Sequence, residues 1–271
     1  MDTITAFLLG LVQGLAEYLP ISSSGHLEIA RQILHVDLGG ADSLQFDVTL
    51  HVATVLSTIV ILWHEFRPLC TSFLTLKRDE NTSTVCKILV SCIPVAIVGV
   101  LFKDQVEEFF GKGLYVVGWC LLATAALLAF SYFFGSRVRS ASQGRPVSYL
   151  DAFIIGIAQA VAVLPGLSRS GSTIATGLIL GNRADRVAQF SFLMVIIPIL
   201  GEALLHIKDI LTEPAAAQQT VGLLPLAVGF ITAFIVGCLA CKWMLAIVKK
   251  GKLIWFAIYC LIVGVTCLIL R

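Results

Sequence analysis

The chain has 271 residues, of which 58% are hydrophobic and 13% charged, with a formal net charge of +2 and eight cysteines. Soluble domains carry about 45–50% apolar and about 25% charged residues, so this chain has too little polar surface to cover a water-soluble globule. The small net charge argues against a nucleic-acid partner. The cysteines are scattered through apolar runs without a histidine cluster, which argues against a zinc site. We therefore predict an integral membrane protein.

The first apolar region, residues 3–35, is interrupted near its middle by the segment QGLAEYLPISSSGHL. Proline removes a backbone donor and breaks a helix, while serine and glycine favour turns and caps. Gln13 and Glu17 are four residues apart and share a helical face, and His26 opens the helix after the break. This region is therefore expected to form a broken helical hairpin.

Six later runs are apolar enough and close enough to 20 residues to cross a bilayer. They are residues 46–64, 86–102, 114–134, 187–205, 221–243 and 253–270. A second interrupted region, 150–181, contains the segment PGLSRSGST. It has the same break of proline, glycine and serine as the first region, so we expect a second broken hairpin.

Lysine and arginine are concentrated in loops 65–87, 135–149 and 242–252, whereas segments 31–45, 103–113 and 206–220 hold few of them. Cytoplasmic loops collect these residues, so the first group is expected inside and the second outside. Each interrupted region must then enter and leave the membrane on one face, the first from outside and the second from inside. The two hairpins are thus predicted to be re-entrant, with their tips meeting near the midplane.

An internal repeat supports this topology. A shift of 146 aligns residues 7–27 with 153–173, with seven of 21 positions identical, where composition alone gives roughly one or two. Three spans separate the copies, so the copies point in opposite directions. We predict an all-α polytopic helical membrane protein, a single integral membrane domain over 1–271. Its two inverted-topology repeats are the halves 1–134 and 150–271, with about six full spans plus two re-entrant hairpins.

Charged side chains mark the two tips. Glutamate, histidine and arginine are costly at membrane depth, so Glu17, His26 and Arg169 are functional candidates. Each returning half-helix begins at its serine cluster, where free N–H groups form an anion site that suits phosphate when an arginine fork joins it. The competing interpretation is structural, with a Glu–Arg pair joining the hairpins and serines only capping helices. Asp47 and His51 share a face and either contribute to the site or hydrogen-bond in the core.

The patterns Q-x-x-x-E, P-x-S-S-S-G-H and P-G-L-S-R-S-G-S-T resemble those of the bacterial undecaprenyl-diphosphatase family. The resemblance covers essentially the whole chain, including FSFLMVIIP and VGFITAFIVG. It implies hydrolysis of undecaprenyl diphosphate to undecaprenyl phosphate plus phosphate, which recycles the lipid carrier of peptidoglycan synthesis, and bacitracin resistance. It also implies location in the bacterial inner membrane, a site that opens to the periplasm, and a divalent cation, Mg or Ca.

The family motifs assign residues by position. The expected catalytic residues are Glu17, Ser23, His26 and Arg169. The expected diphosphate-binding residues are Gln13, Ser22, Ser24, Gly25, Ser168, Ser170, Gly171 and Thr173. Because glutamine stands at 13, the motif offers no two-carboxylate metal site, and the metal role rests on Glu17 and substrate oxygens.

The mechanism keeps alternatives open. Ser23 or His26 attacks the terminal phosphorus, with Glu17 as base, orienter or metal ligand, and we favour Ser23 activated by His26. The family of type 2 phosphatidic-acid phosphatases is excluded, because no histidine follows Arg169 within the second motif. An inverted repeat also suits a lipid-phosphate flippase or secondary transporter. The expected partner is a prenyl diphosphate lipid, and the chain is expected to be a monomer or a homodimer.

Overall fold

The computed structural model describes residues 1–36, 40–110, 113–134, 144–212 and 221–270. In these ranges every regular element is a helix, which confirms the all-α prediction. The helices are α1 Thr3–Ala16, α2 Ser23–Ile33, α3 Gly40–Ile61, α4 Trp63–Leu74, α5 Glu80–Leu101, α6 Lys103–Phe110, α7 Gly113–Phe134, α8 Tyr149–Val161, α9 Arg169–Ile179, α10 Ala184–Met194, α11 Ile196–Thr212, α12 Leu223–Lys249 and α13 Ile254–Ile269.

Five helical stretches in the described ranges are long and apolar enough to cross a membrane. They are Ser43–Ile61, Glu80–Leu101, Gly113–Phe134, Ala184–Lys208 and Leu223–Lys249. The sixth predicted span, 253–270, is α13, which has only 16 residues and belongs with the shorter apolar helices. Helices α4 and α6 occupy segments predicted as loops. The chain is thus a multi-pass membrane protein with additional short helices.

The predicted span 187–205 is divided into α10 and α11 at Val195. Pro198 has no N–H to donate to the carbonyl of Met194 four residues earlier, so the helix is interrupted there. The thiol of Cys92 on α5 donates to this freed carbonyl, with 3.7 Å between sulfur and oxygen. A neighbouring spanning helix therefore compensates in part for the proline.

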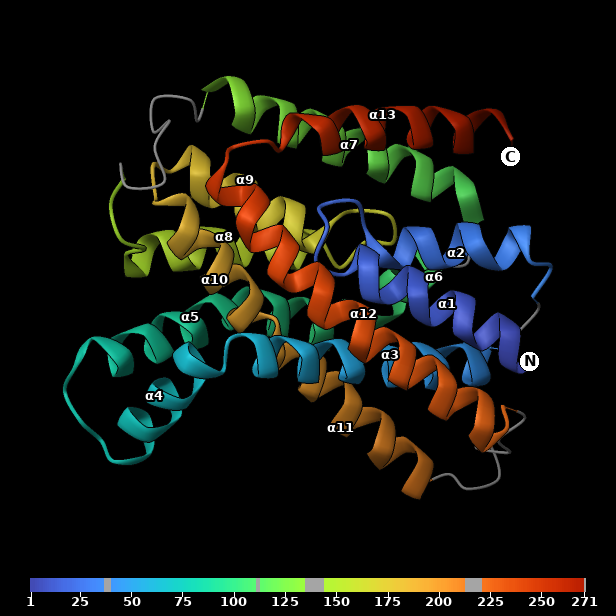
Figure 1. The fold of residues 1–271 in the computed structure, drawn as a ribbon, viewed down its shortest axis with the longest axis horizontal. Coiled ribbons are helices and arrows are strands. Elements are labelled where there is room, and N and C mark those ends of the chain that lie inside the picture. The colour runs from blue at the N-terminus through green and yellow to red at the C-terminus, as the bar shows by residue number, and fades with distance from the viewer. Residues whose placement is uncertain (37–39, 111–112, 135–143, 213–220, 271) are drawn as a thin grey trace.

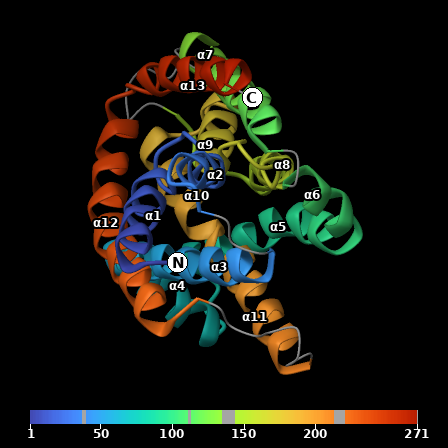
Figure 2. The same cartoon turned by 90° about the vertical axis from the view of Figure 1, so that its right-hand side faces the viewer.

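Two helical pairs, α1 with α2 and α8 with α9, reach the centre of the molecule from opposite ends of its long axis (Figure 1). In the end view, α2, α9 and α10 lie in the middle, with α12, α3, α5 and the α7–α13 pair around them (Figure 2). Helix α1 packs along α12, and α8 packs along α5. Each pair therefore packs against a spanning helix from the other half of the chain, as the repeat hypothesis expects, although the repeat itself stays a prediction.

Close approach in these two packings depends on glycines at matching repeat positions, Gly10 and Gly156. A Cβ atom on Gly10 would lie 2.6 Å from the carbonyl oxygen of Gly229 on α12. A Cβ atom on Gly156 would lie 2.3 Å from the carbonyl oxygen of Ser91 on α5. Both distances are shorter than van der Waals contact, so only glycine allows either helix to pack this closely.

The predicted grouping of loops agrees with the arrangement of the elements. Helix α4 and the connection between α12 and α13 lie at the left end in Figure 1, and these belong to the lysine- and arginine-rich loops. The last turns of α2 and α11 lie at the right end, as do the N-terminus and the end of α13. Which end faces the cytoplasm stays a prediction.

Candidate active site

The two helix breaks end in matching serine caps. Ser22 precedes α2 and its hydroxyl accepts a hydrogen bond from the Gly25 N–H at 3.3 Å, while Ser168 precedes α9 and accepts from the Gly171 N–H at 3.0 Å. Ser22 has a φ angle of 72°, a left-handed backbone that is uncommon outside glycine. The capping role expected for tip serines is thus confirmed for these two, and the helix starts at both tips are well defined.

Direct contacts hold the two tips together. The Ser170 hydroxyl donates to the carbonyl of Leu19 at 3.1 Å, and the Gly166 N–H donates to the Ser24 hydroxyl at 3.4 Å. Figure 1 shows the two connecting loops side by side near the centre. A Cβ atom on Gly25 would lie 3.0 Å from the Gly166 Cα, so this glycine also permits the contact. Ser24, Ser170 and Gly25 thus join the tips, besides any contact they make with substrate.

Glu17 is the hub of the polar network between the tips. One carboxylate oxygen accepts from the Arg169 guanidinium at 2.7 Å. The other accepts from the Ser23 hydroxyl at 2.7 Å and from the Gln13 amide nitrogen at 2.9 Å. The Glu17 side chain is only 8% exposed and that of Arg169 25%. Charge-assisted bonds of this length in a largely desolvated place are strong, so residues 152 positions apart form one unit.

Asp47 and His51 contact different partners. The Nε2 atom of His51 lies 3.8 Å from a carboxylate oxygen of Glu17, so His51 borders the network. Asp47 instead forms a salt bridge with Arg31 at the other end of α2. The sequence interpretation left both roles open, and the structure brings only His51 to the site.

His26 faces a different neighbour from the one expected. Its Nδ1 atom lies 2.8 Å from the carbonyl oxygen of Ser22, and its Nε2 atom lies 2.8 Å from the hydroxyl of Tyr259. The Ser23 hydroxyl donates to Glu17. The carboxylate, and not the imidazole, is therefore the group placed to receive the Ser23 proton in this structure.

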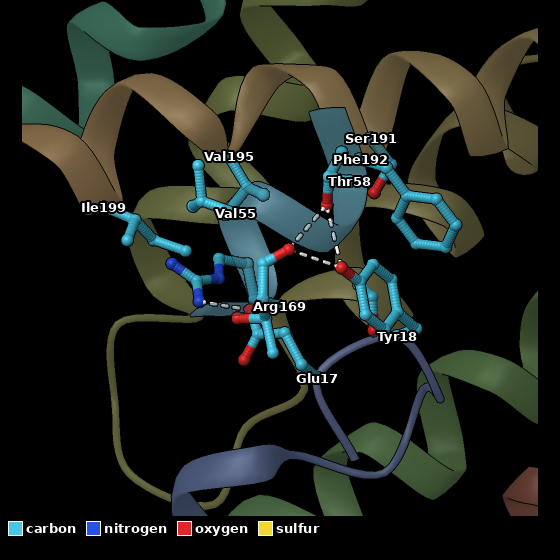
Figure 3. A pocket seen from close by; sticks show the side chains of 11 residues that line it. Glu17, Tyr18, Val55, Thr58, Arg169, Ser191, Phe192, Val195 and Ile199 are labelled. Carbon is cyan, nitrogen blue, oxygen red and sulfur yellow. Dashed lines mark hydrogen bonds and ion pairs between the residues drawn. The ribbon is translucent and has the colours of Figure 1, made fainter. Parts of the chain in front are cut away.

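A small pocket extends from Glu17 and Arg169 towards α10 and α11 (Figure 3). Its cavity volume is about 20 Å³, which is room for about one water molecule. In Figure 3, Val195 and Ile199 lie beside the Arg169 side chain, and the side chains of Tyr18, Thr58 and Ser191 lie on the other side of the view. A phosphate group and a prenyl chain are both larger than this volume, so a substrate of that kind must extend beyond the pocket.

The sequence interpretation did not include several polar pocket residues. Tyr18 is buried and donates to the carbonyl of Thr54 at 2.5 Å, and its oxygen lies 3.0 Å from the Thr58 hydroxyl. Thr54 and Thr58 are four residues apart within an apolar span. This spacing of two polar residues is the sequence signal that could have indicated a polar contact there. Thr173, expected to bind diphosphate, lies 2.5 Å from the Ser191 hydroxyl and also donates to the carbonyl of Arg169 at 2.9 Å. Thr173 therefore connects α9 to α10 through its hydroxyl.

The residues present allow only a shared cation. In the described ranges, no group of three or more His, Cys, Asp or Glu side chains could hold a metal ion. Glu17 is the single carboxylate of the pocket lining. The amide oxygen of Gln13 next to it is buried and has no hydrogen-bond partner among the described residues. Magnesium sites often use one or two carboxylates with substrate phosphates, so these two oxygens fit a cation that the substrate also binds.

Fold and site together define a class: a polytopic helical membrane protein in which a carboxylate, a hydroxyl and a guanidinium meet between two broken-helix tips. The model of the bacitracin resistance protein BacA family matches residues 6–266. The chain belongs to this family.

Relatives match over nearly their whole length. The chain is 55% identical to an undecaprenyl-diphosphatase of Bacteroides fragilis, with 99% of this chain and 98% of that protein aligned. It is 54% identical to one of Parabacteroides distasonis, with all of both chains aligned. It is 39% identical to one of Oceanobacillus iheyensis, with 97% of this chain and 94% of that protein aligned.

Proposed function

We infer that this chain is an undecaprenyl-diphosphatase, which hydrolyses undecaprenyl diphosphate to undecaprenyl phosphate and phosphate. The relatives that align with nearly the whole chain are named undecaprenyl-diphosphatase. One observation in the structure supports it above the others, namely that Glu17 binds Ser23 from its own tip and Arg169 from the opposite tip. These three side chains are the ones that this proposal uses as base, nucleophile and phosphate-binding group.

Ser23 is the nucleophile of this proposal. Its hydroxyl donates to Glu17 at 2.7 Å, and a carboxylate in that position can take the proton as the oxygen attacks. The Ser23 oxygen forms a bond to the terminal phosphorus while the bond from that phosphorus to the bridging oxygen breaks, releasing undecaprenyl phosphate. Water then attacks the phosphorus of the phosphoserine, the bond to the Ser23 oxygen breaks, and phosphate leaves with the hydrogens of the water. Glu17 returns its proton to the Ser23 oxygen. A phosphohistidine at His26 is less favoured, because the Nε2 atom already has Tyr259 as a partner.

Arg169 and the two helix N-termini bind the diphosphate. The guanidinium presents planar donors suited to phosphate oxygens, and it stands at the first position of α9. The first turns of α2 and α9 meet at the tips, so their positive dipole ends also favour an anion. Charge that develops on the transferred phosphoryl group is neutralised by donors already in place.

The divalent cation, Mg or Ca, remains part of the proposal. Glu17 and the amide oxygen of Gln13 would hold it together with oxygens of the diphosphate. Such an ion supplies additional positive charge to the phosphates. With one carboxylate available, its affinity is expected to depend on substrate.

The membrane arrangement is proposed as follows. The α1–α2 and α8–α9 pairs are re-entrant hairpins of two inverted repeats, halves 1–134 and 150–271, which reach the midplane from opposite faces. The basic loops lie inside. Membership of the bacterial family further implies that the chain sits in the bacterial inner membrane with its site open to the periplasm. This supports a role in recycling the lipid carrier of peptidoglycan synthesis and in bacitracin resistance. Whether the active form is a monomer or a homodimer is tested by its mass in detergent.

The decisive experiment is phosphate release from undecaprenyl diphosphate by purified protein in detergent. Ser23→Ala and Arg169→Lys should each lose at least about a hundredfold in turnover, because the nucleophile or the planar fork is removed. Arg183→Lys changes an arginine that pairs with Asp185 away from the pocket and serves as the matched control. A flippase without hydrolase activity would release no phosphate in this assay, and that result would reject the proposal.

A further inference from the structure

Both ring nitrogens of His26 have partners. The Nδ1 atom lies 2.8 Å from the backbone carbonyl oxygen of Ser22, and the Nε2 atom lies 2.8 Å from the hydroxyl oxygen of Tyr259. The rings of His26 and Tyr259 are also stacked, with centroids 5.6 Å apart and planes inclined by 16°. Two hydrogen bonds and one ring contact therefore fix the imidazole in one orientation.

These partners also determine where the protons lie. A carbonyl oxygen can only accept, so the Nδ1 atom of His26 carries a hydrogen and donates to Ser22. In the neutral ring the Nε2 atom then has a free lone pair, and the hydroxyl of Tyr259 is its donor. The Nε2 atom is thus kept as the proton-accepting atom of the ring.

Tyr259 is held by a rigid part of the fold. It lies on α13, and the next residue, Cys260, is buried and donates its thiol to the carbonyl of Pro20 at 3.5 Å. Two consecutive residues of α13 thus contact the first helical pair at its tip. Helix α13 packs closely on α7, since a Cβ atom on Gly118 would lie 3.0 Å from the carbonyl oxygen of Gly264. The hydroxyl of Tyr259 therefore approaches His26 from a fixed base.

We propose that Tyr259 is a positioning residue for the reaction, acting through His26. It holds the imidazole of His26, which lies three residues after Ser23 on α2, as the Nδ1–H tautomer. This proposal rests on the proposed phosphatase function.

The kinetic test is Tyr259→Phe, which keeps the stacked ring and removes only the hydroxyl. One neutral hydrogen bond corresponds to roughly a five- to tenfold effect, so kcat should fall by about that factor while KM changes less than twofold. In a His26→Ala background the same substitution should change kcat by less than about twofold, because the group it positions is gone. Tyr132→Phe is the matched control, since Tyr132 lies on α7, is 42% exposed and contacts the ring of Phe133.

A second measurement does not depend on turnover. Nitrogen-15 spectra of the histidines should show the Nδ1 atom of His26 protonated in the wild type. The Nε2 resonance should move in Tyr259→Phe, which removes its donor, but not in Tyr132→Phe. An unchanged Nε2 resonance, a wild-type kcat in Tyr259→Phe, or an equal loss in both backgrounds would overturn the proposal. If the wild type itself releases no phosphate, the proposed function fails, and the spectra still decide whether Tyr259 positions His26.

Discussion

The ion pair between Glu17 and Arg169 should appear as a coupling free energy in a double-mutant cycle. The two side chains share a hydrogen bond of 2.7 Å and are 8% and 25% exposed. A hydrogen bond to a charged group contributes about 1.5–3 kcal/mol, and because Arg169 keeps some contact with solvent we expect a coupling of about 2 kcal/mol. Glu17→Gln and Arg169→Gln should each cost more than that alone, because each leaves a partner unpaired. The double variant should cost about 2 kcal/mol less than their sum.

The assay is reversible unfolding in mixed detergent micelles, applied to the wild type, both single variants and the double variant. The bonds that Glu17 also makes to Ser23 and Gln13 do not contribute to the coupling free energy, because they are lost equally with and without the arginine. Arg183 and Asp185 form the control pair, at 2.9 Å and with 36% and 21% exposure, and should couple by less than about 1 kcal/mol. Losses for Glu17 and Arg169 that add within about 0.5 kcal/mol would refute the reasoning.

Three further predictions follow from contacts at the tips and between helices. Ser23→Ala should lose at least about a hundredfold in phosphate release and about 1.5–3 kcal/mol in stability, because it removes a bond to a charged group. Ser24→Ala should keep most activity and lose about 1 kcal/mol, because it removes the bond to Gly166. Gly10→Ala should destabilise the fold by about 1–3 kcal/mol through overpacking, as judged from unfolding midpoints, while Gly99→Ala, with nothing within 4 Å, should not. Chelation by EDTA should reduce turnover without lowering the Tm of substrate-free protein, because the proposed cation depends on the diphosphate.

Much of the site could be predicted because the internal repeat and the loop charges relate segments that are far apart in the sequence. The matched segments and the basic loops predicted that the tips meet, and the bond between Arg169 and Glu17 shows that they do. Periodicity alone would not have related positions 152 residues apart. The break in the span 187–205 could also have been expected, because Pro198 stands inside the apolar run.

Other features could not be read from one sequence. The partner of His26 is Tyr259, which is 233 positions away, and no repeat relates the two, since their contact depends on how α13 packs on α7. Helix α4 was predicted as loop because residues 65–87 contain four Lys or Arg residues, yet Leu69 and Ser72 provide a buried face. The hydroxyls of Ser24 and Ser170 were assigned to phosphate, whereas here they bond to the opposite tip.

The separation of Glu17 and Arg169 by 152 residues also matters during biosynthesis. At about 5–20 residues per second, the ribosome needs roughly 8–30 s after making the acid before it adds the guanidinium. Throughout that interval the Glu17 carboxylate of the nascent first hairpin lacks its partner Arg169, and α12, on which α1 packs, is made later still. The early hairpin must therefore stay hydrated or be shielded by the insertion machinery. A ribosome that stalls in the middle of the message leaves a fragment whose Glu17 carboxylate is costly to bury in lipid.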